Sequence, residues 1–161
     1  MKELIDKMSS YNLFNYLLPG VLFIIILDGF TTYSFTQDNL IVGAFVSYFI
    51  GLVISRFGSL IIEPVLKKIS FLRFADYAEF VFASKKDSKI DVLSESNNMY
   101  RTFSSMLILL LLLKFYELIE LKFQMLKNWN PYILIVLLLI MFLYSYRKQT
   151  EYITKRIKTN N

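Results

Sequence analysis

The sequence predicts an all-α membrane protein with four transmembrane helices and a short helical cytoplasmic module between spans two and three. Hydrophobic residues make up 55% of the 161 positions, and the mean hydropathy is +0.47, both above the level of ordinary soluble domains. The apolar residues are gathered in four long blocks bounded by polar or aromatic residues. A helix needs about 20 mostly apolar residues to cross a bilayer, so we expect one membrane domain, residues 1–161.

The four predicted spans cover approximately residues 11–30, 40–62, 103–121 and 129–146. A short apolar run can also be a buried helix of a soluble protein, but four such runs leave too little polar sequence to cover them. Residues 1–10 carry both charge signs, and no small-residue cleavage site follows the first block. We therefore interpret this block as a permanent anchor rather than a cleaved signal peptide.

The distribution of lysine and arginine predicts which side of the membrane each segment faces. Fourteen of the eighteen basic residues lie in the N-terminal segment, in the loop 66–102 and in the tail 147–161. The two remaining connections hold only Lys122 and Lys127. Because basic residues are concentrated in cytoplasmic segments, we expect both termini and the loop to lie in the cytoplasm.

The residue types that are missing exclude several kinds of chemistry. The chain contains no cysteine and no histidine, so disulfides, thiolate nucleophiles and imidazole bases are excluded, and zinc sites lose their usual ligands. The five glycines are scattered and form no phosphate-binding loop. We therefore predict that the protein is not an enzyme and holds no metal or cofactor.

Span two carries a ridge of small residues. They recur every four positions, at Gly43, Ser47, Gly51, Ser55 and Ser59, so they share one face of the helix. Small residues let two helix backbones approach closely, which favours association in lipid. The ridge either packs within the single chain or contributes to oligomer packing or a pore lining.

Charged residues fall within the predicted spans at Asp28, Arg56, Lys114 and Glu117, and Glu120 follows at helical spacing. Charges in lipid are costly and often functional, so the first four are candidate pore or intramembrane polar residues. We expect Lys114 and Glu117, three positions apart, to neutralise each other, and Asp28 to lie at a depth where it could also pair with Lys114. Arg56 could extend to the headgroups. Pro19 and Gly20 interrupt span one and indicate either a hinge or a tolerated kink.

The cytoplasmic loop is patterned rather than featureless. Its apolar positions Phe71, Phe74, Ala75, Ala78, Val81 and Phe82 predict an amphipathic helix that lies on the membrane or against neighbouring subunits. After a break at residues 84–88, a second helical face continues into span three. The basic tail is predicted to prolong span four as a short helix.

A polar cluster in the same loop is a candidate binding site for a ligand or partner. Its members are Lys85, Lys86, Lys89, Asn97, Tyr100 and Arg101. Amide, phenol and guanidinium groups beside lysines could bind an anionic ligand such as a nucleotide or oligonucleotide. The alternative is attraction to anionic lipids, at about 1 kcal/mol per basic residue.

Three strings resemble a type of small bacterial four-span protein found beside phage-defence genes. They are NLFNYLLPGVLF at residues 12–23, YFIGLVISRFGSLIIEP at residues 48–64 and KKDSKIDVLSESNNMYRT at residues 85–102. Among such proteins the chain resembles the membrane effector of the Hailong defence system more than the membrane subunit of the Kiwa system. The resemblance implies a homo-oligomeric, channel-like protein of the bacterial inner membrane, controlled by a nucleotidyltransferase product, that depolarises the membrane and arrests growth.

We therefore expect an oligomeric effector that conducts ions when triggered by a cytoplasmic signal. The competing hypothesis is a non-conducting scaffold or sensor that recruits a soluble cytoplasmic partner to the lipid bilayer. Ion flux through liposomes that contain the purified protein separates the two.

Overall fold

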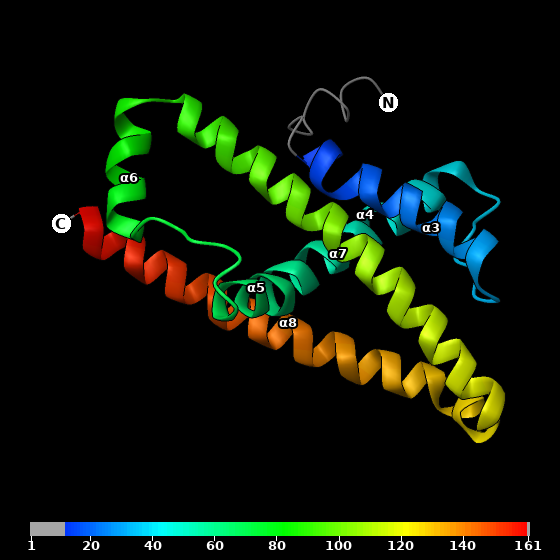
Figure 1. Cartoon of the computed structure of the whole chain (residues 1–161). Coiled ribbons are helices and arrows are strands. Elements are labelled where there is room, and N and C mark those ends of the chain that lie inside the picture. The colour runs from blue at the N-terminus through cyan, green and yellow to red at the C-terminus, as the bar shows by residue number, and fades with distance from the viewer. Residues whose placement is uncertain (1–11, 161) are drawn as a thin grey trace.

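A computed structural model of the chain describes residues 12–160, and the regular structure in this part is helical (Figure 1). Its helices that are long and apolar enough to cross a membrane are Leu13–Phe30, Leu40–Lys68, Lys89–Lys122 and Met125–Thr159. The predicted all-α architecture with four spans is therefore confirmed. The predicted first residue of span one, Tyr11, lies outside the described residues, as do Lys2, Lys7 and Asn161.

Spans one and two each contain a turn of π-helix just before a proline. Span one consists of η1 (Leu13–Leu17) and α3 (Leu18–Phe30), and span two of α4 (Leu40–Phe57), η2 (Gly58–Ile62) and α5 (Glu63–Lys68). A proline lacks an N–H, and its ring clashes with the carbonyl four residues earlier. For Pro19 and Pro64 that carbonyl belongs to Asn15 and Leu60, the central residues of the two π-helices. The wide turns therefore accommodate both prolines within continuous helices.

The helical module between spans two and three is shorter than the sequence indicates. Its helix, α6, covers Tyr77–Lys86, so the predicted amphipathic helix is wrong over residues 71–76, which are not helical. The Asp76 carboxylate accepts a hydrogen bond from the Ala78 N–H at 2.8 Å and caps the first turn. Asp76 and Glu79, three residues apart, form the sequence pattern of a helix start, so this boundary was readable from the sequence.

Two long helices form the other half of the molecule. Helix α7 (Lys89–Lys122) runs without a break from the module through span three, and α8 (Met125–Asn160) includes span four and the basic tail. At 1.5 Å per residue they are about 50 Å long, so each projects roughly 20 Å beyond a 30 Å hydrocarbon core. They diverge from the hairpin at residues 123–124, and α6 lies across their open ends (Figure 1).

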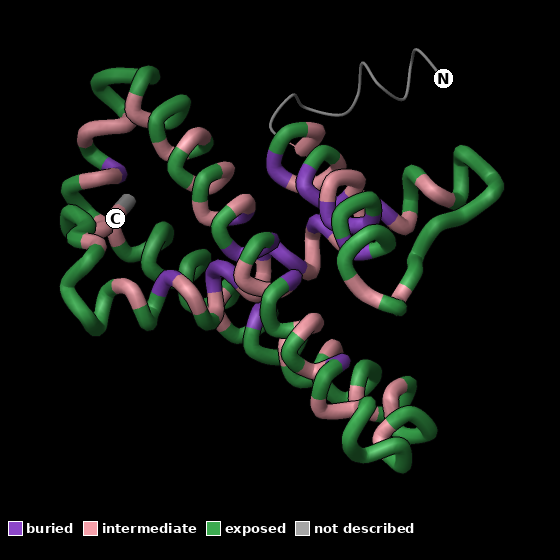
Figure 2. The backbone as a smooth tube through the Cα atoms, turned by 45° about the vertical axis from the view of Figure 1, so that its right-hand side comes forward, coloured by how far each residue is buried: buried purple, intermediate pink, exposed green. Residues whose placement is uncertain are grey.

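The apolar core lies where the first three spans cross. It is formed by Phe23, Leu27, Ile54, Met106 and Leu110. Among the residues described, α8 contributes none to this core, and span four is almost entirely exposed within the single chain. Figure 2 shows the buried positions gathered mostly at the crossing of these spans, with exposed backbone toward the ends.

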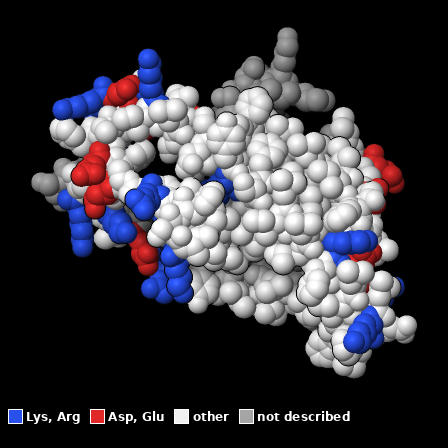
Figure 3. All heavy atoms as spheres, in the orientation of Figure 1, with Lys and Arg blue, Asp and Glu red and all other residues white. Residues whose placement is uncertain are grey.

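The charge distribution fits a bilayer. On the face drawn in Figure 3, charged side chains gather mainly at two ends of the molecule, and a broad uncharged surface lies between them. Many large apolar side chains on this chain are exposed, including Ile25, Phe45, Leu111 and Leu137. A surface of this kind requires lipid or protein to cover it, which agrees with a membrane-spanning protein.

Candidate functional site

Polar side chains from all four spans meet at the end of the bundle nearest α6. We call this group the α6-side cluster; its members are Asn15, Ser59, Glu63, Lys67, Arg101, Thr102 and Lys148. Its centre is the Glu63 carboxylate, whose side chain is only 9% exposed. Arg101 Nη1 lies 2.8 Å from Glu63 Oε2, and Lys67 Nζ lies 2.9 Å from Oε1. Two cations therefore compensate a carboxylate that would be costly to bury alone.

Span four joins this cluster through Lys148. The Lys148 amine donates hydrogen bonds to the Ser59 carbonyl oxygen at 2.6 Å and to the Ser59 hydroxyl at 2.8 Å. The Glu63 carboxylate attracts the Lys148 amine, and the cations of Arg101, Lys67 and Arg56 repel it. Counted together with Arg56, the cluster brings four cations around one carboxylate, a formal net charge of +3 (four minus one).

Span one joins the cluster through a buried side-chain bond. The Thr102 hydroxyl lies 2.9 Å from Asn15 Oδ1, with both residues almost fully buried. Asn15 is the central residue of η1, so the wide turn before Pro19 positions this amide. Buried polar groups of this kind fix how two helices are paired, because an unmatched partner costs about 1–3 kcal/mol.

Gly58 brings α7 close enough to span two for these contacts. A Cβ placed on Gly58 would lie 3.2 Å from Arg101 Cγ and 3.3 Å from Ser105 Cβ, which is closer than ordinary packing. Any larger residue would push α7 away from η2. The close approach sets the Arg101 guanidinium against the Glu63 carboxylate.

A second polar group lies at the opposite end, beside the hairpin that joins α7 and α8. We call it the hairpin-side cluster; its members are Thr32, Tyr33, Lys114, Tyr116, Glu117, Glu120 and Asn130. The Thr32 N–H donates to Glu117 Oε1 at 2.7 Å, and Lys114 Nζ lies 2.7 Å from Oε2. The connection after span one is thereby fastened to α7.

Glu120 makes a parallel set of contacts one turn further along. The Tyr33 hydroxyl donates to Glu120 Oε2 at 2.6 Å, and Asn130 Nδ2 donates to Oε1 at 2.6 Å. Burial, together with this bond to Glu120, raises the pKa of the Tyr33 phenol, so Tyr33 stays a hydrogen-bond donor at physiological pH. The Tyr116 hydroxyl completes the set by donating to Asn130 Oδ1 at 2.7 Å.

The structure distinguishes among the predicted intramembrane charges. Lys114 and Glu117 form the expected ion pair, with Glu117 buried and Lys114 partly exposed. The possible pair of Asp28 with Lys114 does not form, because Asp28 is exposed and has no ion pair within residues 12–160. Lys114 instead takes the local partner on its own helix and lies over the Phe30 ring. Arg56 lies near Lys148, at the edge of the α6-side cluster.

The small-residue ridge of span two packs against span one. Ser47, Gly51, Ser55 and Ser59 are buried in the single chain, whereas Gly43 is partly exposed. A Cβ on Gly51 would collide with the backbone of Tyr16. The first of the two alternatives, packing within the chain, therefore holds for these buried positions; an added role in oligomer packing stays a prediction.

The six candidate binding residues do not form one site. Lys85, Lys86 and Lys89 lie around the junction of α6 and α7, where the Lys86 amine sits 4.2 Å from the centre of the Phe82 ring. Arg101 is about 18 Å further along α7 and is bonded to Glu63. Asn97 and Tyr100 are exposed on the helix between them. The six residues are therefore spread along about 18 Å of helix rather than gathered in one pocket, and their role in binding a ligand stays a prediction.

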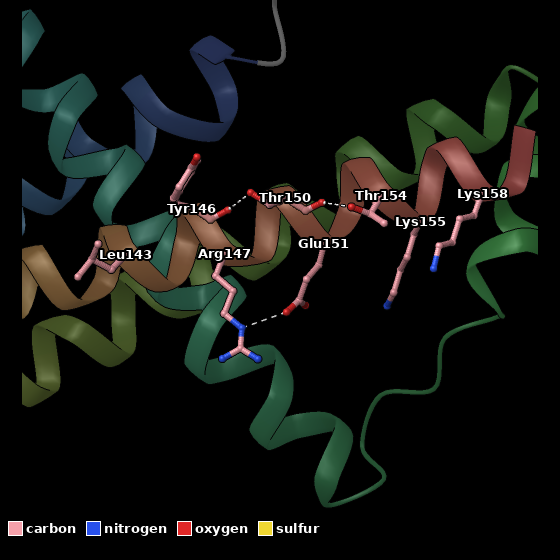
Figure 4. A pocket seen from close by; sticks show the side chains of 8 residues that line it. All are labelled: Leu143, Tyr146, Arg147, Thr150, Glu151, Thr154, Lys155 and Lys158. Carbon is pink, nitrogen blue, oxygen red and sulfur yellow. Dashed lines mark hydrogen bonds and ion pairs between the residues drawn. The ribbon is translucent and has the colours of Figure 1, made fainter.

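A pocket of about 520 Å³ lies along the C-terminal half of α8 (Figure 4). Its lining side chains all belong to this helix, between Leu143 and Lys158, and include the Arg147–Glu151 pair at 3.1 Å. With one helix as its only lining, the pocket is an open groove. Within the described part of the chain, no group of three acidic residues could hold a metal ion.

The central contacts of the α6-side cluster involve residues that sequence reasoning missed. Glu63 and Lys148 lie just beyond the apolar blocks of spans two and four, and nothing in the sequence indicates that they face the same buried point. Two features of the sequence could have indicated the site. One is the carboxylate of Glu63 directly before Pro64, and the other is the presence of the polar residues Asn15 and Thr102 beside apolar blocks. Comparison with protein-family models, curated proteins and solved structures finds no match to this chain.

Proposed function

We propose that the protein is an oligomeric, channel-like effector of a bacterial inner membrane, with both termini in the cytoplasm, gated by a cytoplasmic signal. The observation that carries this proposal is the arrangement of charge on α7. This one continuous helix binds Glu63 through Arg101 on the α6 side of the bundle and carries Glu117, bonded to Lys114 and Thr32, on the hairpin side. A change in the α6-side contacts can therefore move the hairpin-side contacts as a unit.

The position of the apolar core supports a pathway formed between subunits. Phe23, Leu27, Ile54, Met106 and Leu110 lie between the two polar clusters and seal the interior of the single chain. Ions require polar groups or water along their path. Span four is almost wholly exposed, so it is available to line or bound a pathway in a homo-oligomer.

The biological setting rests on the resemblance to Hailong-type effectors. In that setting the trigger is a nucleotide or oligonucleotide, or a soluble cytoplasmic partner. Opening would depolarise the membrane and arrest the growth of an infected cell. A ligand can bias such an equilibrium only by binding the two states with different affinity.

A non-conducting scaffold is the second candidate function. It is favoured by the exposed lysines at the junction of α6 and α7, which project beyond the apolar part of the bundle. Such a surface suits a soluble acidic partner. In liposomes, a scaffold would give no ion flux above that of protein-free vesicles, whereas the channel-like effector would.

The proposed orientation predicts the outcome of cysteine labelling, since the chain has no native cysteine. Ser88→Cys should react with a membrane-impermeant maleimide only after the cells are opened, because Ser88 lies beside the cytoplasmic module. Gln37→Cys, in the connection between spans one and two, should react in intact cells. Both positions are exposed in the structure. External labelling at Ser88 would overturn the orientation.

The proposed coupling predicts different effects for the two clusters in a flux assay. Arg101→Ala should raise basal flux while the protein still inserts, because it releases the Glu63 contact. If the closed state loses about 1.4 kcal/mol of stability, the ratio of open to closed protein rises tenfold. Lys114→Ala and Glu117→Ala should change ion selectivity, because charges beside a pathway set its local field. Arg147→Ala, whose side chain is 74% exposed, is the control. Unchanged flux and unchanged growth protection during phage challenge in all three variants would reject the coupling.

A further inference from the structure

The α6-side cluster holds more positive charge than its own carboxylate can neutralise. Glu63 accepts from Arg101 and Lys67, Lys148 binds Ser59, and Arg56 has no hydrogen bond or ion pair among the described residues. Like charges this close repel one another. From this imbalance we infer that the cluster is a binding site for a phosphate group, supplied by an anionic phospholipid of the adjacent leaflet.

The depth of the cluster matches the phosphates of a bilayer. Glu63 directly follows the apolar block of span two, Arg101 lies two residues before that of span three, and Lys148 lies two residues after that of span four. Three separate spans therefore place these groups at the same apolar–polar boundary. Phospholipid headgroups lie at this boundary, and basic residues there attract anionic lipids.

The donors that a phosphate would need are present and partly unused. Arg101 Nε is buried and has no hydrogen-bond acceptor in the described part of the chain. The Lys148 amine has three N–H donors, two of which contact Ser59. A phosphate oxygen only accepts hydrogen bonds, and charge-assisted bonds of this kind are the strong ones.

The cluster can be reached from outside the bundle. The Lys67 side chain is 43% exposed and that of Arg101 is 20% exposed. A phosphate on a soluble nucleotide or oligonucleotide offers the same chemistry, so the source must be tested. The lipid is favoured because the cluster lies at headgroup depth and not on the projecting ends of α7 and α8. The inference does not depend on whether the protein conducts ions.

A bound phosphate would join helices that have few other contacts. Besides the bonds of Lys148 and those of Asn130 beside the hairpin, α8 meets the rest of the chain through ring contacts such as Phe49 with Phe142 and Tyr77 with Tyr152. A phosphate between Lys148 and Arg101 would tie α8 to α7 where the two helices diverge. The lipid would thereby act as part of the tertiary structure.

Native mass spectrometry of the delipidated protein tests this inference. Phosphatidylglycerol or phosphatidylcholine is added, and the dissociation constant of the first bound lipid is measured. Wild-type protein should prefer phosphatidylglycerol, and Arg56→Gln and Lys148→Gln should each weaken its binding about fivefold, the change for losing one basic residue near the surface. Arg56→Gln breaks no bond seen in the structure, so it should fold normally. Arg147→Gln, at the exposed neighbour of Lys148, should bind like wild type.

Equal affinity for the two lipids, or equal losses in Arg147→Gln and Arg56→Gln, would overturn the proposed site. A further arm adds inorganic phosphate or a short oligonucleotide to protein already carrying phosphatidylglycerol. Retention of the lipid supports the lipid assignment. Displacement that depends on Arg56 and Lys148 would assign the cluster to a soluble phosphate and overturn the lipid as its source.

Discussion

Glu63→Gln is expected to lower the free energy of unfolding by about 3–5 kcal/mol, the range for breaking a buried ion pair by removing one partner. The neutral side chain would leave Arg101 and Lys67 without the carboxylate that now lies within 3 Å of both. Lys148 and Arg56 would add to the repulsion. Unfolding by a denaturing detergent, followed by circular dichroism in mixed micelles, measures the change.

The matched control is Glu151→Gln. Glu151 pairs with Arg147 at 3.1 Å, but both side chains are more than half exposed, and exposed pairs contribute about 0–1 kcal/mol. In the double variant Glu63→Gln with Arg101→Gln, the loss should be smaller than the sum of the two single losses, because no charge is then left opposite a missing partner. Equal effects of Glu63→Gln and Glu151→Gln would show that the α6-side cluster is solvated rather than buried.

Gly51→Leu is expected to separate spans one and two. A Cβ at this position already meets the backbone of Tyr16, which a side-chain rotation cannot relieve. The cost should reach or exceed the 1–3 kcal/mol typical of overpacking. Thermal unfolding in detergent measures the stability, and native mass in detergent measures the assembly. If the variant stays oligomeric with unchanged mass, the ridge packs only within the monomer.

Gly43→Leu tests the same ridge at a position with room. A Cβ there would lie 3.7 Å from Gln37 Cβ, an ordinary contact, so we expect a change within about 0.5 kcal/mol. A loss of stability equal to that of Gly51→Leu would mean that the added bulk acts through lipid or a neighbouring subunit. It would contradict packing within the chain as the main role of Gly51.

The membrane architecture was predictable because lipid imposes a simple rule. Backbone groups in the hydrocarbon must be satisfied within a helix, and each apolar block is therefore a helix of nearly fixed length. The spacing of apolar residues predicted the start of α6 too early, because a helix begins at its capping residue even where apolar residues at helical spacing precede it. Phe71 and Phe74 fit the predicted face, yet the Asp76 cap starts the helix after them.

Charge partners were less predictable than helices. Lys114 could pair with Asp28 or Glu117. It pairs with Glu117, because that carboxylate lies on the same helix and the contact does not depend on how two helices pack. Arg101 and Glu63 are 38 residues apart in sequence, and their contact depends on how closely Gly58 lets α7 approach. Sequence spacing carries no information of that kind, so the sequence did not indicate that Arg101 has a carboxylate partner within the chain.

The prolines that follow η1 and η2 have a consequence for how this protein can move. A π turn holds one extra residue, and if it migrated along its helix, each side chain it passed would rotate by about 100°. A return to regular α-helix there would bring the rings of Pro19 and Pro64 against the carbonyls of Asn15 and Leu60, so both extra residues are held in place. Asn15 and Ser59 keep one rotational setting. Spans one and two can therefore tilt or slide as whole rods, but they cannot change register at their α6 ends.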